Sequence, residues 1–261
     1  MPLRFRQFID LPPHTEGGFD HADVHPPSGK VYVAHTALGQ VEIIDGEEGR
    51  HLATVSDCPE ASGVLYAPEL DVMVAAARGA GRVLLLEASS GALVRTADVG
   101  PKPNGLAWDP GRCRLLVADV QDFQARLLDP TTGEILASTV LPGRPRWCVY
   151  DPVDQCFWVN IREPAGIAVL GAATGALTAF VPVASAGPHG LALDEAADRL
   201  FVACDSGDVL VVQRATRTSQ ARVPIGGEPD VIWLNTRRQR LYLAMGHPGL
   251  LQVLDTQTMV I

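Results

Sequence analysis

Apolar and β-branched residues gather in short segments along the chain, and polar turn residues separate these segments. One phrase recurs six times: an apolar segment, a turn often built on Asp-Pro, and a second apolar segment. The clearest copies are PNGLAWDPGRCRLLVAD (103–119) and PHGLALDEAADRLFVAC (188–204). No segment carries a helical period over any length, so the pattern predicts β-strands paired through tight turns.

The six copies recur at an even spacing. A gapless alignment on the turn puts these residues at the start of the first strand, at intervals of 42, 42, 42, 43 and 41 residues: Asp20, Ser62, Asn104, Arg146, His189 and Asp230. A period of about 40–45 residues is typical of four-stranded propeller blades. The first five copies continue with a third and a fourth segment, and most of them join these two through a Gly-bearing turn that suits a hairpin. The spacing predicts an all-β fold, a six-bladed β-propeller of four-stranded antiparallel blades, as one domain over residues 1–261.

The two ends of the chain predict how the blades close. The last copy stops at LLQVLDTQTMVI, its third strand, whereas LRFRQFIDLP near the N-terminus resembles the fourth strands of the other copies. We expect the N-terminal segment to pair with the last blade, because closure protects sheet edges that would otherwise be exposed. An open β-solenoid is the alternative, but it leaves that segment without a role.

Composition narrows the classes of partner. The formal net charge is −9, the pI is about 5.2 and no basic run occurs, which argues against DNA, RNA or an anionic membrane as partner. No apolar stretch approaches the roughly 18 residues of a membrane span, and no signal peptide is recognisable. Five cysteines without a C-x-x-C pair favour reduced thiols and a cytoplasmic location. Composition does not constrain the oligomeric state.

The chemistry is expected where first strands begin. Antiparallel pairing brings these starts close to the ends of the second strands, so both sets of residues share one mouth of the channel. The polar side chains there differ from blade to blade, as a binding site for an asymmetric ligand requires; the alternative is that they hydrate the channel or bond to strand-end amides. The predicted substrate-binding residues are His21, His35, Glu60, Ser62, Asp119, Arg146 and Cys204.

Two carboxylates and an imidazole occur on three consecutive blades. Asp20, His189 and Asp230, with Asn104 as a further oxygen donor, form a predicted site for a divalent metal ion, namely Ca²⁺, Mg²⁺, Mn²⁺ or Zn²⁺. We expect His189 and Asp230 to be catalytic. Arg146 either holds a carboxylate or phosphate of the substrate or pairs with Asp20 or Asp230.

Two further side chains have alternative interpretations. Cys204 is either a nucleophile with a histidine base or a buried small apolar residue, and the second role is the commoner one. Asp23 stands in a mostly apolar row of the alignment, which predicts a local pair with His21 or His25.

The phrases PNGLAWDP…LLVAD and PHGLALDE…LFVAC resemble the senescence-marker-protein/gluconolactonase-like family and, more loosely, YVTN- and NHL-type propellers. The resemblance implies six blades, a divalent metal held by Glu, Asn and Asp at the starts of inner strands, and hydrolysis of lactones or related esters. Asn104 matches the N-G-L-A-W type motif, whereas His189 stands where that family has Asp. Asp20 replaces its Glu, unless Glu16 takes that role, and Arg146 replaces a neutral ligand.

Three functions follow from these patterns. The first is a metal-dependent hydrolase of a small, anionic lactone or ester that acts at the channel mouth. The second is a lyase on the same metal with histidine as base, similar to antibiotic-opening propeller lyases of the Vgb type. The third is a non-catalytic propeller that binds a protein or a small ligand. The short loops predict a shallow, open site.

Overall fold

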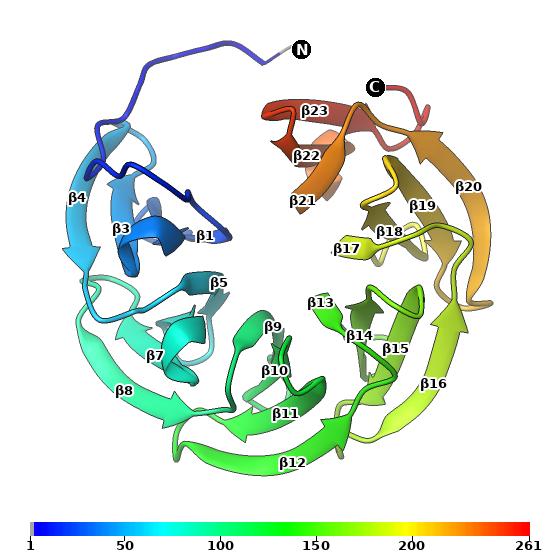
Figure 1. Cartoon of the computed structure of the whole chain (residues 1–261), viewed down its shortest axis with the longest axis horizontal. Coiled ribbons are helices and arrows are strands. Elements are labelled where there is room, and N and C mark those ends of the chain that lie inside the picture. The colour runs from blue at the N-terminus through cyan, green and yellow to red at the C-terminus, as the bar shows by residue number, and fades with distance from the viewer. Residues whose placement is uncertain (1–2) are drawn as a thin grey trace. The chain divides into compact units, whose positions relative to one another are not determined.

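Strands dominate the computed structural model, which describes residues 3–261. Six antiparallel sheets follow one another along the chain, and in each sheet consecutive strands are neighbours (Figure 1). Five sheets have four strands and the last has three. Short 3₁₀ turns are the helical elements of the described residues. The predicted fold class, an all-β six-bladed β-propeller, is confirmed, and each sheet is one blade.

The chain divides into two compact units, Met1–Pro103 and Asn104–Ile261. The first unit holds the first two blades. The first blade consists of β1 (Ala22–His25), β2 (Lys30–His35), β3 (Gln40–Asp45) and β4 (Arg50–Val55), with the 3₁₀ turn η1 (Thr36–Leu38). The second consists of β5 (Ala61–Ala67), β6 (Val72–Ala77), β7 (Arg82–Glu87) and β8 (Leu93–Asp98), with η2 (Arg78–Ala80).

The second unit holds the other four blades, apart from Pro103 at the start of β9. The third blade is β9 (Pro103–Asp109), β10 (Arg114–Asp119), β11 (Gln124–Asp129) and β12 (Glu134–Val140). The fourth is β13 (Pro145–Asp151), β14 (Cys156–Ile161), β15 (Gly166–Gly171) and β16 (Leu177–Pro182). The fifth is β17 (Pro188–Asp194), β18 (Arg199–Cys204), β19 (Asp208–Gln213) and β20 (Thr218–Pro224). The sixth is β21 (Glu228–Asn235), β22 (Arg240–His247) and β23 (Leu250–Asp255), with η3 (Thr236–Arg238).

The turn between the third and fourth strands has the predicted glycine in four blades. Gly49, Gly91, Gly133 and Gly175 all have φ between 68° and 82°, a left-handed conformation that glycine adopts without steric cost. Arg217 stands at the same place in the fifth blade and takes φ 58°. The periodic glycine is therefore a backbone requirement of the hairpin.

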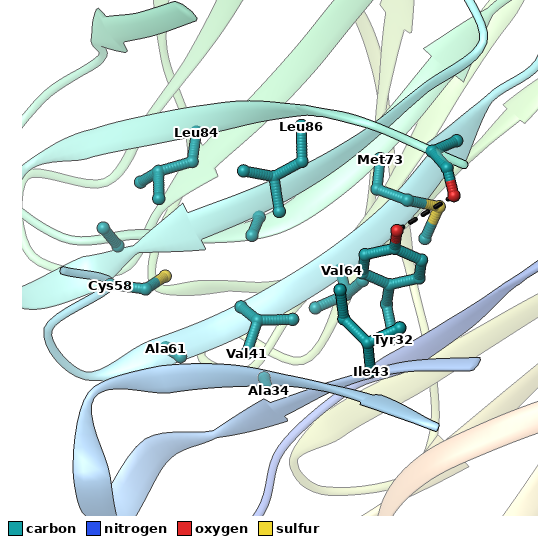
Figure 2. Packing of buried hydrophobic residues seen from close by; sticks show 13 residues of the cluster. Tyr32, Ala34, Val41, Ile43, Cys58, Ala61, Val64, Met73, Leu84 and Leu86 are labelled. Atoms are coloured by element: carbon teal, nitrogen blue, oxygen red, sulfur yellow. Dashed lines mark hydrogen bonds between the residues drawn. The ribbon is translucent and has the colours of Figure 1, made fainter. Parts of the chain in front are cut away.

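Apolar side chains fill the space between neighbouring blades. In the first unit, Tyr32 and Ile43 of the first blade pack against Met73 and Leu86 of the second, and all four are almost completely buried (Figure 2). The Tyr32 hydroxyl donates to the carbonyl oxygen of Ala88 at 2.9 Å, which satisfies the one polar atom that this side chain buries. Each fully buried side chain of this size contributes about 1.5–3 kcal/mol relative to an exposed one.

A β-bulge interrupts the first strand in four blades at the positions that the alignment singled out. The register with the second strand shifts between Ala61 and Val64, Pro145 and Cys148, Pro188 and Leu191, and Pro229 and Ile232. Ser62, Arg146, His189 and Asp230 lie inside these four bulges. Because a bulge releases residues from regular pairing and redirects their side chains, it sets the direction in which these four residues point.

The predicted N-terminal strand is wrong. Residues 3–21 contain no strand, and β23 has one strand neighbour, β22, among the described residues. The Gln7 side chain instead donates to the carbonyl oxygens of Glu48 and Gly49, in the turn between β3 and β4. This bond ties the segment to the first blade, and it leaves Phe5 and Phe8 exposed. The segment is thus held by side-chain contacts and by isolated backbone hydrogen bonds near Gly18 and Asp20, rather than by a β-ladder.

One domain over residues 1–261 stays a prediction. Among residues 3–261, no helix is long and apolar enough to cross a membrane.

Candidate functional site

His189 lies between two carboxylates in the second unit. Its Nδ1 is 2.8 Å from Asp205 Oδ1, and its Nε2 is 3.2 Å from Asp230 Oδ1. The bulges in β17 and β21 supply His189 and Asp230, and Asp205 follows the last residue of β18. The side chains of His189, Asp205 and Asp230 are 16%, 20% and 44% exposed, so solvent reaches this group from the Asp230 side.

Arginines surround the same carboxylates. Arg162 Nε is 2.9 Å from Asp205 Oδ2, and Arg162 follows the last residue of β14. Arg146, in the bulge of β13, has a buried Nε without a hydrogen-bond partner among the described residues. A guanidinium has five N–H donors, and a buried donor without a partner costs free energy. Arg146 as a residue is only half-buried, so the rest of its guanidinium group is the part that can meet an anion.

The charges at this group shift three pKa values. Burial lowers the pKa of His189, but the hydrogen bonds to Asp205 and Asp230 outweigh burial, so the pKa lies above its ordinary value. Burial raises the pKa of the Asp205 carboxyl, but the hydrogen bond from His189 and the charges of His189, Arg162 and Arg146 lower it overall. Burial, and then repulsion by Arg144 and Arg162, lowers the pKa of Arg146, which stays charged at neutral pH. His189 is accordingly more protonated at neutral pH than an exposed histidine.

Two open pockets meet at Asp205 and Ser206. One, of about 560 Å³, is lined by Arg162, Pro164 and Gly187 among others. The other, of about 450 Å³, is lined by Ile225, Glu228 and His247 among others. We call His189, Asp205, Asp230, Arg146 and Arg162 the His189 cluster; Asp205 and Arg162 line these pockets, so the hollow surface borders the cluster on that side.

The predicted metal ligands do not fit a metal ion as the structure places them. His189 and Asp230 lie beside each other, but the positive charges of Arg146 and Arg162 oppose a cation next to them. Asp20 belongs to the first unit, where its Oδ1 lies 2.5 Å from His21 Nδ1. Within residues 3–261, no group of three or more His, Cys, Asp and Glu side chains is arranged to hold a metal. Asn104, the fourth predicted ligand, is buried at the start of β9.

The first unit brings together a different set of the predicted residues. Arg78 lies 3.8 Å from Asp20 and 3.3 Å from Glu60, and Lys102 lies 3.2 Å from the same Glu60 carboxylate. Asp20 also pairs with His21. Each carboxylate of this set already faces a cationic group of the protein, so the set forms a chain of ion pairs.

Four predicted substrate-binding residues, His35, Ser62, Asp119 and Cys204, have 0% of their surface exposed. The Ser62 hydroxyl donates to Pro103 O at 3.2 Å, Asp119 accepts from the Gln121 and Asp122 amides, and burial raises the pKa of the Cys204 thiol to about 12. Direct contact with a substrate is not compatible with these positions. Cys204 has the properties of the buried apolar residue, because a nucleophilic thiol requires a lowered pKa.

Asp23 does not form the predicted histidine pair. Its carboxylate accepts from the backbone amides of Tyr66 and Val24, each at 2.8 Å, and so joins β1 to β5. Burial raises the pKa of Asp23, against the opposing effect of these two amides.

Arg162 is the residue of this site that the alignment missed. Arg78, Arg162 and Asp205 all stand one position after the last residue of the second strand, in the second, fourth and fifth blades. The alignment singled out the last residue of the second strand, which is buried at Asp119 and Cys204, rather than the residue that follows it. A charged residue just beyond an apolar strand was the available signal.

Comparisons with known proteins support the fold and leave the function open. No family model matches the chain, and no curated protein matches it. Among many solved structures with this fold, a chain of Kuenenia stuttgartiensis hydrazine synthase is similar, with a TM-score of 0.66 and 12% identity over 92% of this chain and 96% of that chain. At this level of identity the likeness shows the propeller fold alone, and the senescence-marker-protein/gluconolactonase-like resemblance stays a resemblance.

Proposed function

We propose that the protein hydrolyses a small anionic ester or lactone at the His189 cluster, with His189 as general acid. The observation that carries the proposal is the asymmetric setting of the His189 ring. Asp205, itself paired with Arg162, accepts from Nδ1 at 2.8 Å, whereas Nε2 faces the more exposed Asp230 at 3.2 Å. One nitrogen is thus fixed in orientation, and the other is turned toward the open side.

The charges assign a role to each side chain. Arg146, whose side chain is half-buried, binds the carboxylate or phosphate of the substrate through its guanidinium group, and Arg162 adds positive charge beside it. Asp205 orients His189 and stabilises its protonated form. The raised pKa of His189 suits a group that donates a proton near neutral pH.

In the proposed step, water attacks the acyl carbon and the bond from that carbon to the leaving oxygen breaks. His189 Nε2 gives its proton to the leaving oxygen, and the Asp230 carboxylate takes a proton from the attacking water. The products are an acid and an alcohol, joined in one hydroxy acid when the substrate is a lactone. The step uses side chains alone, because the predicted metal ligands do not fit a cation. A lyase that uses His189 as base is less favoured, since a base requires an unprotonated ring.

Charge and cysteine chemistry support the rest of the proposal. With a net charge of −9, we expect a small-molecule substrate rather than nucleic acid or a membrane. All five cysteines are free, which fits the cytoplasmic location that we propose.

Hydrolysis of a panel of lactones and esters, half of them carrying a carboxylate or phosphate, tests the proposal. The protein is first treated with a chelator. We expect turnover of anionic members, a loss of about 10²–10⁴-fold in kcat for His189→Asn, and a raised KM for Arg146→Met. The variant Asp230→Asn removes the proposed base. Its matched control is Asp98→Asn, which changes an exposed carboxylate of β8.

Calorimetric titration with a short dicarboxylate and with inorganic phosphate separates binding from turnover. Binding that Arg146→Met abolishes, without hydrolysis of any panel member, would leave the protein as a non-catalytic small-ligand binder. Absence of both turnover and Arg146-dependent binding would refute the site itself.

A further inference from the structure

A chain of hydrogen-bonded side chains runs across the first blade, outside the His189 cluster. His14 Nδ1 lies 2.8 Å from His35 Nε2, and His35 Nδ1 lies 2.8 Å from Glu42 Oε1. On the far side, His51 Nε2 lies 2.9 Å from Glu42 Oε2, which also accepts from the Thr54 hydroxyl at 2.6 Å. His14 comes from the segment before β1, and the other four come from β2, β3 and β4. We call these five residues the His14–His51 chain.

The proton positions follow from the partners. Glu42 is 0% exposed and accepts from His35, His51 and Thr54, so its carboxylate holds a proton on His35 Nδ1. His35 Nε2 then has one partner, His14 Nδ1. A hydrogen bond between two imidazole nitrogens contains one proton, with one nitrogen donating and the other accepting.

The hydrogen bond between His14 and His35 can therefore persist with one positively charged ring but not with two. With one added proton, either ring can be cationic, because the other ring still offers a lone pair. With two added protons, both facing nitrogens carry hydrogen, and two positive rings meet at 2.8 Å. The contact cannot persist in that state.

We propose that the His14–His35 contact is an acid-released latch, which holds the N-terminal segment (residues 3–19) on the first blade near neutral pH and frees it when both imidazoles are protonated. The segment contains no strand and is otherwise held by few polar contacts: Gln7 donates to Glu48 O and Gly49 O, and Gly18 O accepts from the Ala37 amide at 3.0 Å. Phe19 stacks on His35 with ring centroids 4.3 Å apart. Loss of the latch therefore frees an end on which Leu3, Phe5 and Phe8 are already exposed.

The groups that face the His14–His35 pair determine whether acid or alkali releases the segment. Glu42 and His51 are the titratable side chains joined to it by hydrogen bonds in the described part of the chain, and Glu42 favours a first proton on His35. The second proton enters against an existing positive charge, so release requires acidification rather than a rise in pH. This device is independent of the hydrolysis proposed for the His189 cluster.

Nuclear magnetic resonance of the full chain at about pH 7.5 and about pH 5.0 tests the latch, since these values lie on either side of the ordinary histidine pKa. The readouts are ¹⁵N relaxation of residues 3–19 and the protection factor of the Ala37 amide, corrected for the pH dependence of intrinsic exchange. On acidification we expect fast motion to appear in the segment and the Ala37 protection factor to fall severalfold, because the amide loses Gly18 O as its acceptor when the segment is released.

Two substitutions of His14 separate the latch from a general effect of acid. His14→Asn keeps a donor and an acceptor near the Nδ1 position and does not titrate, so the segment should stay ordered at both pH values. His14→Ala removes the partner, so the segment should be mobile at both. Gln7→Ala should loosen the segment without adding pH dependence. Wild-type order at both pH values, or acid release that persists in His14→Asn, would overturn the proposal.

Discussion

The His35–Glu42 pair of the first blade and the His189–Asp205 pair of the fifth have the same contact distance, 2.8 Å. Their surroundings differ. Both side chains of the first pair are 0% exposed, whereas those of the second are 16% and 20% exposed. The far nitrogen of His35 faces His14, and that of His189 faces the half-exposed Asp230. A fully buried histidine–carboxylate pair therefore serves to hold two segments together. A partly exposed pair of the same kind is available for proton transfer.

The buried pair should dominate stability. In Glu42→Leu, His35, His51 and Thr54 lose their shared acceptor, although leucine is the residue that stands at this position in the second and fifth blades, as Leu84 and Leu210. We expect a loss of about 3–5 kcal/mol in the free energy of unfolding, measured by denaturant titration. The change Glu47→Ala, in an exposed turn, is the control.

A second variant sharpens that measurement. In the double variant Glu42→Leu/His35→Leu, one of the stranded donors is removed as well, so part of the loss should be recovered. A loss under about 1 kcal/mol in Glu42→Leu would mean that the sealed pair is no more important to folding than an exposed one.

The open pair should matter less to folding and more to protonation. Asp205→Asn removes the carboxylate that accepts from His189 Nδ1, so the pKa of His189 should fall, as ¹H–¹⁵N spectra of the imidazole would show. We expect a cost of about 1 kcal/mol in unfolding free energy near pH 6, since the lost bond is charge-assisted but partly exposed.

The pH dependence of that cost has a definite sign. The folded-state pKa of His189 lies above the unfolded value, so its contribution is complete below the ordinary pKa of about 6.5 and is lost as pH rises through the folded value. The difference between wild type and Asp205→Asn should therefore shrink on going to alkaline pH. A difference that grows with pH would contradict a protonated His189.

Arg146 should show the smallest effect, in the opposite direction. Its buried Nε has no partner among the described residues and its guanidinium is repelled by Arg144 and Arg162, so Arg146→Met removes an unfavourable burial while keeping side-chain volume. We expect a gain of up to about 1 kcal/mol in unfolding free energy together with loss of anion binding. Arg95→Met, on the exposed strand β8, is the matched control. A destabilised Arg146→Met would indicate a structural ion pair instead.

Periodicity was sufficient to predict the blades. The spacing of the six phrases located the first and second strands in each blade, and the glycines at 49, 91, 133 and 175 located the hairpins, because both depend on backbone geometry that repeats. The same argument identified His189 and Asp230 as neighbours from adjacent blades. It failed for Arg162, because the direction of a residue just beyond a strand depends on the turn that follows.

Contacts outside the repeat were beyond the same reasoning. His14 lies before the first phrase, so no equivalent position marks it. Glu42 was detectable, since Leu84, Ala168 and Leu210 occupy its place in three other blades, although Arg126 and Gln252 stand there in the remaining two, and a buried carboxylate must find partners. The N-terminal segment has a strand-like composition, but the contact of Gln7 with two backbone carbonyls, which no pattern encodes, places it in the structure.

The bulges in the first strands have a consequence for how such a protein changes over evolutionary time. Ser62, Arg146, His189 and Asp230 occupy the same structural position, and each side chain stands where the ladder has already been interrupted. A substitution there changes no strand pairing, so the scaffold tolerates serine, arginine, histidine or aspartate alike. New ligand specificities can therefore arise by exchanging one residue per blade at the partly exposed bulges, and a designer can follow the same route by varying Arg146, His189 and Asp230 while keeping the rest of each blade fixed.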